Sequence, residues 1–189
     1  MDKISIFWFR RDLRLKDNHG LFQALESGKK VLPIFIFDED ILDLLENKSD
    51  KRVDFIVQAL QTLNSFLKSK NKGIKIFKGK PLEIYKKLSQ NYEIEAVYCN
   101  EDYEPYAIKR DQEIADFLAS KNIAFHSFKD QVIFHKDEIV KADKKPYTVY
   151  TPYSKLWLNE FQKVDLQGFP SEKKLDNLLK LLRHYYPEV

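Results

Sequence analysis

Charged and aromatic residues cluster in four short stretches of the sequence, each of which follows an apolar run. The stretches read RRDLRLKDN (10–18), FDEDIL (37–42), KGKP (78–81) and NEDYEPY (100–106). They contain little glycine, and neither a G-x-G-x-x-G nor a P-loop pattern occurs, so a phosphate held by bare backbone amides is disfavoured. A ligand bound by these stretches would therefore be contacted by side chains.

The stretch at 100–106 contains the residue types that bind a flat heteroaromatic ring. Tyr103 and Tyr106 flank Glu104, which places stacking faces beside an acceptor for ring N–H groups. The same residues suit an ordinary solvated loop that ends where Pro105 starts a helix. Residue types alone leave both interpretations open.

The stretch at 10–18 carries four cations and two acids, which are Arg10, Arg11, Arg14, Lys16, Asp12 and Asp17. It could be a solvated turn that is ion-paired to neighbouring loops, or it could contact a ligand. A mixed role is the third alternative. One arginine would pair with neighbouring loops, while another would present its planar guanidinium group to a flat anionic ligand.

The sequence predicts no catalytic residue and no metal site. The four histidines are scattered without ligand spacing. No serine lies in a Gly-x-Ser-x-Gly setting, and Cys99 lies inside an apolar run, as expected of a small buried side chain. Trp8 and Trp157 could carry electrons, but core packing is the commoner role of tryptophan.

Composition indicates a globular protein without a strongly basic DNA-binding stripe, and it leaves a local basic patch open as an alternative. The chain has 189 residues, 43% hydrophobic content and a net charge of +3, with lysines and acids interleaved. This length suits one compact domain plus an appendage of roughly 40 to 60 residues. No leader pattern or membrane-length apolar run occurs, and one cysteine allows no internal disulfide. We therefore expect a soluble cytoplasmic protein.

The four stretches are positioned by alternating strands and helices. The expected strands span 4–9, 31–37, 74–77, 95–100 and 123–128, and the expected helices span 18–27, 50–70, a segment starting at Pro81, and 106–120. Five strands alternating with helices predict an α/β fold with an open, mostly parallel sheet, either Rossmann-like or flavodoxin-like. The charged stretches would then lie at the carboxyl ends of the strands, where such sheets bind ligands.

Glycine and proline positions in the sequence predict where individual helices end and where a strand starts. Gly28 and Gly73 are expected to end the first two helices, and Pro33 to lie near the start of the second strand. Beyond residue 130 the alternation stops. The sequence there predicts a short hairpin, the aromatic-rich segment PYTVYTPYSKLW, a helix at 153–161, a linker at DLQGFPSE, and a charged helix at 171–184.

Six segments of the chain resemble DNA photolyases and cryptochromes in order and spacing. FWFRRDLRLKDNHGLFQAL is similar to the start of that family, where the first strand and loop read Trp-x-Arg-Arg-Asp-Leu-Arg-Leu-x-Asp-Asn. The others are IFIFDEDIL, KRVDFIVQALQTLNSFL, IKIFKGKP, AVYCNEDYEPYAIKRD and PYTVYTPYSKLW. The resemblance covers roughly residues 3 to 160 and is closest to cyclobutane pyrimidine dimer photolyases of the deazaflavin or FMN antenna type.

The resemblance implies a two-domain protein of which this chain is one part. Residues 1–130 would form an α/β antenna-chromophore domain, and residues 131–189 an extended linker region leading to a helical domain that binds FAD and UV-damaged DNA. The whole protein would be a deoxyribodipyrimidine photolyase, a carbon–carbon lyase driven by light. This chain, an expressed fragment or a truncated gene product, would be inactive alone. The alternatives are a cryptochrome photoreceptor and a stand-alone nucleotide- or flavin-binding module.

The resemblance also implies which residues hold the antenna chromophore. The matching positions here are Ile36, Phe37, Asp38, Arg52 and the loop from Asn100 to Ile108, which includes Glu101, Asp102, Tyr103, Glu104 and Tyr106. We further expect Arg11 to approach the ligand, Asp12 to hold its loop, and this loop to tie together the loops after the second and fourth strands.

The same positions bear on the identity of the chromophore. Folate-type photolyases carry an Asn-Glu pair where this chain has Tyr106 and Ala107, which favours deazaflavin or FMN over a folate of that type. Other folate-binding cryptochromes hold the folate differently, and some family members leave the cleft empty.

Overall fold

The computed structural model describes residues 3–46, 50–181 and 187. These residues form a five-stranded sheet in the order β3-β2-β1-β4-β5, in which every pair is parallel. The strands are β1 (Ile4–Phe9), β2 (Lys30–Asp38), β3 (Lys75–Gly79), β4 (Ile94–Asn100) and β5 (Ala124–Phe128). The expected α/β sheet is confirmed, and its order is that of the Rossmann-like alternative.

Each of the first four strands is followed by a helix at a position that the periodicity predicts. The helices are α1 (His19–Glu26), α2 (Glu39–Leu42), α3 (Lys51–Lys68), α4 (Pro81–Asn91), α5 (Pro105–Ala119), α6 (Tyr150–Phe161) and a 3-10 helix, η1 (Ser171–Asn177). Pro81 and Pro105 each lie in the first turn of a helix, where an N–H has no intrahelical partner.

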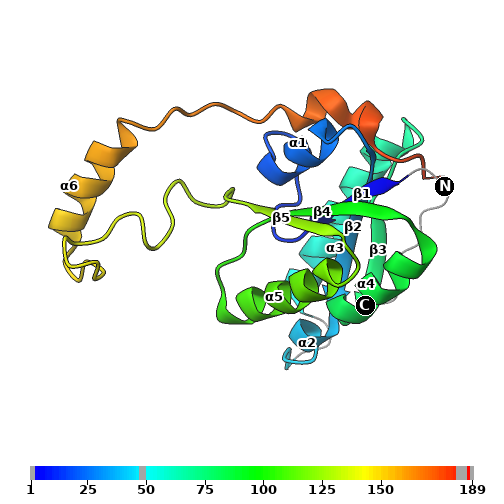
Figure 1. The fold of residues 1–189 in the computed structure, drawn as a ribbon, viewed down its shortest axis with the longest axis horizontal. Coiled ribbons are helices and arrows are strands. Elements are labelled where there is room, and N and C mark those ends of the chain that lie inside the picture. The colour runs from blue at the N-terminus through cyan, green and yellow to red at the C-terminus, as the bar shows by residue number, and fades with distance from the viewer. Residues whose placement is uncertain (1–2, 47–49, 182–186, 188–189) are drawn as a thin grey trace.

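The sheet is buried on both faces because its central strand is apolar on both. Side chains of β1 alternate, so that Ile6 and Trp8 pack with α4 and α5, while Phe7 and Phe9 pack with α1 and α3. All four side chains are at most 2% exposed. Figure 1 shows the resulting layers of helices on either side of the sheet.

Of the two predicted helix ends, one is confirmed and the other is wrong. Gly28 has φ 76° and ends α1 in the left-handed region, as predicted. After α3, however, the left-handed residue is Asn71 with φ 55°, and the prediction for Gly73 is wrong. Asparagine enters this region because its short polar side chain hydrogen-bonds locally.

Beyond β5 the chain leaves the sheet. Residues 129–149 are all described and form no strand, so the predicted hairpin is wrong. Helix α6 starts three residues earlier than expected, and none of its residues is buried. It stands apart from the α/β layers at the end of two extended segments (Figure 1).

The chain then returns to the α/β layers. The predicted helix at 171–184 is instead the short η1, after which Leu178 forms a bridge with Val31, and residues 182–184 lie outside the described residues. Leu175 and Leu178 are buried against the α1 side of the sheet, and this packing overrides local helix propensity. The division at residue 130 remains a prediction, but residues 171–178 share the core of the α/β unit.

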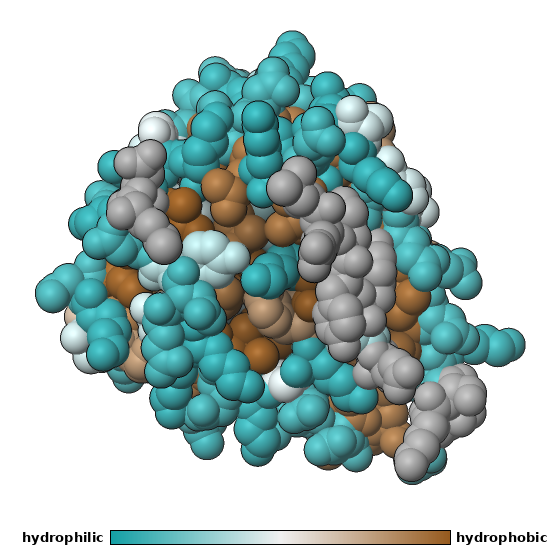
Figure 2. Space-filling view, turned by 90° about the vertical axis from the view of Figure 1, so that its right-hand side faces the viewer, coloured by the Kyte–Doolittle hydropathy of each residue, from teal (hydrophilic) through white to brown (hydrophobic). Residues whose placement is uncertain are grey.

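One face of the molecule is mostly hydrophilic (Figure 2). On the face shown in Figure 2, hydrophilic side chains surround a hollow in which apolar side chains are visible. No helix among the described residues has the length and apolar character needed to cross a bilayer.

Candidate functional site

A cavity of about 340 Å³ lies at the carboxyl edge of the sheet. It is lined by the ends of β1 and β2, by α2 and the start of α3, and by the loop and first turns that lead into α5. Strand order reverses at β1, which pairs with β2 on one side and β4 on the other. Open α/β sheets bind ligands at this switch point, so this cavity, the cleft, is the first candidate site.

The walls of the cleft are largely apolar. Strands contribute Trp8, Phe9, Phe35, Ile36 and Phe37, helices contribute Ile41, Leu42, Val53, Ile56 and Ala107, and the segment after α2 contributes Leu45. Strand side chains such as Phe37 are buried, whereas Ile41 at the mouth is 44% exposed. A flat ring could therefore bury its faces here while one edge meets polar groups.

Polar groups converge on Asp38, the last residue of β2. The Tyr106 hydroxyl donates to Asp38 Oδ2 over 2.8 Å, and Arg110 Nη1 lies 3.6 Å from the same oxygen. Burial raises the pKa of Asp38, although Tyr106 and Arg110 oppose the shift. Burial and the bond to Asp38 raise the pKa of Tyr106, so its proton stays on the phenol.

Two arginines lie close to the indole ring of Trp8. The guanidinium carbon of Arg10 lies 4.2 Å from the ring centroid, and that of Arg110 lies 4.8 Å away. Arg10 Nη1 pairs with Asp111 at 2.7 Å, and Arg110 Nη2 pairs with the same carboxylate at 3.1 Å. Arg10 Nε is buried without a partner among the described residues.

Two further arginines lie at the mouth of the cleft. Arg11 pairs with Glu104 at 2.6 Å and with Asp102 at 3.4 Å, and the bond to Glu104 raises the pKa of Arg11. Arg52 donates to both oxygens of Asp50, at 2.9 and 2.6 Å. These bonds lower the pKa of Asp50 to about 2.

Asp12 holds its loop, as expected. This buried carboxylate accepts from Arg10 N at 2.7 Å and from the side-chain amide of Asn18 at 3.2 Å. It also accepts from the side-chain amide of Asn100, whose Oδ1 accepts from Gly20 N at 2.7 Å. A Cβ at Gly20 would lie only 2.7 Å from that oxygen, so glycine permits the close approach.

The contacts that connect the loops after β1, β2 and β4 differ in part from the expectation. Arg11 does connect the first loop to the loop after β4. The contacts to Asp38 after β2, however, come from Tyr106 and Arg110 of α5 rather than from the first loop. Because α5 begins at the end of β4, its first turns can reach across β1 to β2.

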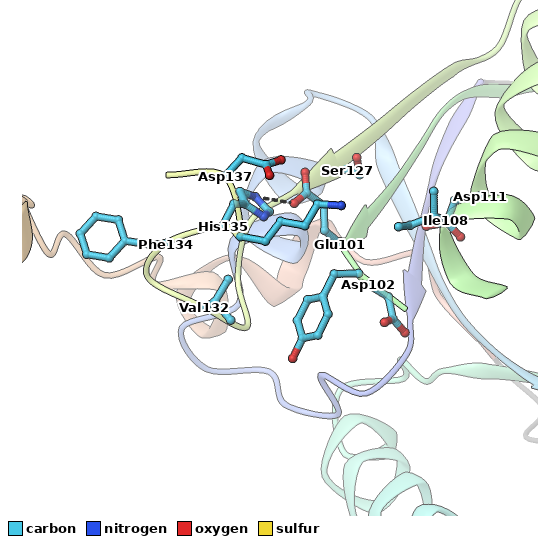
Figure 3. A pocket seen from close by; sticks show the side chains of 11 residues that line it. Glu101, Asp102, Ile108, Asp111, Ser127, Val132, Phe134, His135 and Asp137 are labelled. Atoms are coloured by element: carbon cyan, nitrogen blue, oxygen red, sulfur yellow. Dashed lines mark ion pairs between the residues drawn. The ribbon is translucent and has the colours of Figure 1, made fainter. Parts of the chain in front are cut away.

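The structure brings eight of the eleven candidate residues to the cleft, namely Arg11, Ile36, Phe37, Asp38, Arg52, Asp102, Glu104 and Tyr106. Asn100 lies apart in the buried network around Asp12. Glu101 and Tyr103 line a neighbouring hollow of about 440 Å³, where His135 and Glu101 pair at 2.7 Å (Figure 3).

Sequence reasoning missed Arg10 and Arg110 as lining residues. Arg110 stands four positions after Tyr106 on a helix, a spacing that places both on one face and could have identified it. No comparable signal separates Arg10 from its neighbour Arg11.

The apolar walls and polar edge of the cleft could bind and orient a flat ring. The residues that line the cleft include no nucleophile paired with a base. Cys99 is close to Arg10 but buried, and burial raises the pKa of its thiol to about 12, so it stays protonated. No cluster of three or more metal-ligating side chains forms among the described residues.

Comparisons with known proteins agree on one family. The model of the DNA photolyase family matches residues 5–173. Deoxyribodipyrimidine photo-lyase of Synechococcus sp. is 34% identical over 152 residues, covering 80% of this chain and 31% of the relative. The photo-lyase of Alkalihalophilus pseudofirmus is 33% identical, covering 84% of this chain and 33% of the relative. The chain thus spans about a third of the length of these two curated relatives.

Solved structures show the same fold. A bacterial class III photolyase from Agrobacterium tumefaciens superposes with a TM-score of 0.74 at 23% identity, covering 100% of this chain and 37% of the other. An archaeal photolyase from Sulfolobus tokodaii, described with two FAD molecules and a novel light-harvesting cofactor, gives a TM-score of 0.70 at 27% identity, covering 92% of this chain and 41% of the other.

Proposed function

The chain belongs to the DNA photolyase family, and from this premise we propose that its α/β unit is the antenna domain of a deoxyribodipyrimidine photolyase. The whole protein would repair cyclobutane pyrimidine dimers in UV-damaged DNA with light, using FAD bound in a separate helical domain. The observation that carries the proposal is a ring-sized cleft at the switch point of the sheet that combines apolar walls with a polar edge.

The residues present fit a flavin-type chromophore, either a deazaflavin or FMN. Such rings are flat and apolar on their faces and carry an edge with an N–H donor and carbonyl acceptors. Asp38 would accept from the N–H, and Arg110 would donate to a carbonyl oxygen. Phe37, Ile41 and Val53 offer apolar contacts to the faces. The cleft volume of about 340 Å³ lies within the range of small-molecule sites.

A folate bound through an Asn-Glu pair fits less well. Ala107 is 2% exposed and has no polar side chain, and the hydroxyl of Tyr106 is already bonded to Asp38. These two positions therefore offer a folate neither a free carboxylate nor a free amide.

An antenna requires positioning rather than proton transfer. The bound dye would absorb light and pass the excitation to FAD, while the protein fixes its orientation and excludes water. Two features serve rigidity here. Asp38 ends a buried strand, and the ion pairs of Asp111 fix Arg10 and Arg110 beside Trp8.

The direct test is titration of the purified chain with a deazaflavin, with FMN and with a reduced folate, followed by visible absorption and dye fluorescence. We expect the two flavin-type rings to bind and the folate to bind more weakly. A chain that has native circular dichroism and binds none of them would refute the proposal.

A cryptochrome photoreceptor is the second candidate, because relatives include Cryptochrome-1 of Drosophila melanogaster, which is 30% identical over 127 residues. The antenna cleft would serve either protein. Repair of a dimer-containing oligonucleotide by the full-length protein distinguishes the two, since only the lyase restores the pyrimidines.

A further inference from the structure

One short segment of the α/β unit contacts both ends of a long excursion of the chain. Residues 131–168, the arm, leave the sheet after β5, carry α6 and return before η1 (Figure 1). The chain on either side of the arm, at residues 129–130 and 169–171, lies against residues 14–19, which we call the joint. The joint directly follows the part of the first loop that reaches the cleft.

The departing end is held at Asp130, whose side chain is only 4% exposed. Arg14 Nη2 donates to both of its carboxylate oxygens at 2.7 Å, and His19 N donates to Oδ1 at 3.1 Å. His19 Nδ1 also donates to Lys129 O over 3.0 Å. A carboxylate that accepts from a guanidinium group and a backbone N–H at once is held in one position.

Two exposed ion pairs add to the departing end. His135 lies 2.7 Å from Glu101, and Lys129 lies 2.8 Å from Glu138. The four side chains are between 33% and 42% exposed, and ion pairs at such positions contribute little to holding a segment in place. The buried Asp130 is therefore the firmest contact of this end.

The returning end is held at Phe169. Its N–H donates to Asp17 Oδ1 over 2.8 Å, and its ring stacks on that of His19, with centroids 3.7 Å apart and an interplanar angle of 8°. Asp17 has φ 50°, a left-handed conformation that aspartate adopts because its short polar side chain hydrogen-bonds locally. His19 thus contacts the chain at both ends of the arm.

Ser171 fastens the same end to the interior of the loop. Its hydroxyl donates to Leu15 O over 2.7 Å and accepts from Asn18 N at 3.1 Å. Ser171 and Asn18 are both 0% exposed, so these bonds are shielded from water. The side-chain amide of Asn18 in turn donates to Asp12, which accepts from Arg10 N. A continuous set of hydrogen bonds therefore joins the end of the arm to the loop beside the cleft.

We propose that residues 14–19 fix the directions in which the arm leaves and returns, with Arg14, Asp17 and His19 as the positioning residues. The charged stretch at 10–18 then has two parts, one at the cleft and one at the arm. The consequence for light harvesting rests on the proposed function. If the arm belongs to the linker that leads to the FAD domain, the joint sets the angle between the chromophore and FAD.

Two substitutions at Asp17 test the returning end. Asp17→Gly removes the acceptor and suits a positive φ, so loss of the contact is separated from backbone strain. Asp17→Asn keeps an acceptor oxygen and also tolerates this φ. In amide hydrogen exchange followed by NMR, Phe169 N should exchange about tenfold faster in Asp17→Gly, because its bond to a carboxylate is lost. In Asp17→Asn its rate should change by less than about threefold.

Distances between nitroxide labels report on the arm itself. One label is placed in the arm by Leu166→Cys, at a position 65% exposed, and the other on an exposed position of α5 by Glu113→Cys. Cys99 stays unlabelled, because it is buried and its thiol pKa is raised to about 12. We expect a narrow distance distribution in the labelled parent and a broader one after Asp17→Gly. Lys144→Gly is the control, since Lys144 also has a positive φ, of 62°, but lies within the arm.

Arg14→Gln tests the departing end. It removes the cation beside Asp130, whose Oδ1 accepts from His19 N, so His19 N should exchange roughly fivefold to tenfold faster. Arg14→Lys keeps the charge without the planar fork and should give an intermediate rate. Far-UV circular dichroism and the urea midpoint establish that each variant is folded before its rates are compared.

The outcomes separate this inference from the proposed function, because no chromophore is used. A broad distance distribution in the labelled parent, or a distribution that Asp17→Gly leaves unchanged, overturns the joint and leaves the antenna function standing. Exchange rates at Phe169 N and His19 N that stay at the wild-type values in Asp17→Gly and Arg14→Gln also overturn it. Failure of a folded chain to bind any chromophore would refute the antenna function, while the joint would still be judged by these measurements.

Discussion

Asn100 offers the sharpest test of the structure. The family resemblance places it in the chromophore site, whereas the structure places it in the buried hydrogen-bond network around Asp12. Its side chain is buried and makes three hydrogen bonds, to Asp12, to Asn18 and from Gly20 N. The Asn100→Ala variant removes all three bonds and leaves the Asp12 carboxylate with one donor fewer. At about 1 kcal/mol per bond, plus the cost of buried groups left unpaired, we expect a loss of about 3 to 5 kcal/mol.

Urea unfolding followed by far-UV circular dichroism measures this loss. Asn91→Ala is the matched control, because Asn91 is exposed at the end of α4 and bonds only to Lys87 O among the described residues. The control should cost less than about 0.5 kcal/mol. A loss below about 1 kcal/mol for Asn100→Ala would refute the buried network.

The remaining predictions concern the cleft and the returning segment. Tyr106→Ala and Arg52→Ala should weaken flavin binding in titrations, and unchanged affinity would remove them from the site. Arg52→Ala should also leave the melting temperature nearly unchanged, because its side chain is 76% exposed. Burial raises the pKa of Asp38 above 3.8, so the stability contributed by its protonated form is lost as pH rises through the raised value. The Asp38→Asn variant should therefore gain stability relative to wild type in urea titrations as the pH rises from below 3.8 through the raised pKa of Asp38, and a constant difference would contradict the shift. Leu175→Ala should cost about 2 to 4 kcal/mol because its side chain is 3% exposed in the core; a near-native urea midpoint would place η1 outside the folded unit.

Much of the fold could be predicted because strands buried on both faces leave continuous apolar runs. Residues 4–9 and 31–37 carry this signal, and helical spacing marks α3 and α5. Strand order was left open by the sequence, because short crossovers permit both a Rossmann-like and a flavodoxin-like arrangement.

The errors arise where long-range contacts decide the local structure. The charged segment after residue 171 has helical composition, but burial of Leu175 and Leu178 against α1 and β2 shortens it to η1. At the end of β4 and in the loop that follows, residue types could not separate Asn100, which lies in the buried network, from Glu104, which lies at the cleft. The face that a loop residue presents depends on the neighbouring strand, which the local sequence does not encode.

Helix α6 and its two extended connections have a practical consequence for handling the protein. A protease that cuts one connection would leave residues 171–178 attached to the α/β unit without a continuous backbone, because Ser171 donates to Leu15 O and Leu178 is buried beside β2. The nicked molecule would migrate as two fragments under denaturing conditions and as one particle under native ones. The cleft would remain intact in that complex, so chromophore-loaded crystals could be sought after α6 has been removed by cuts in both connections.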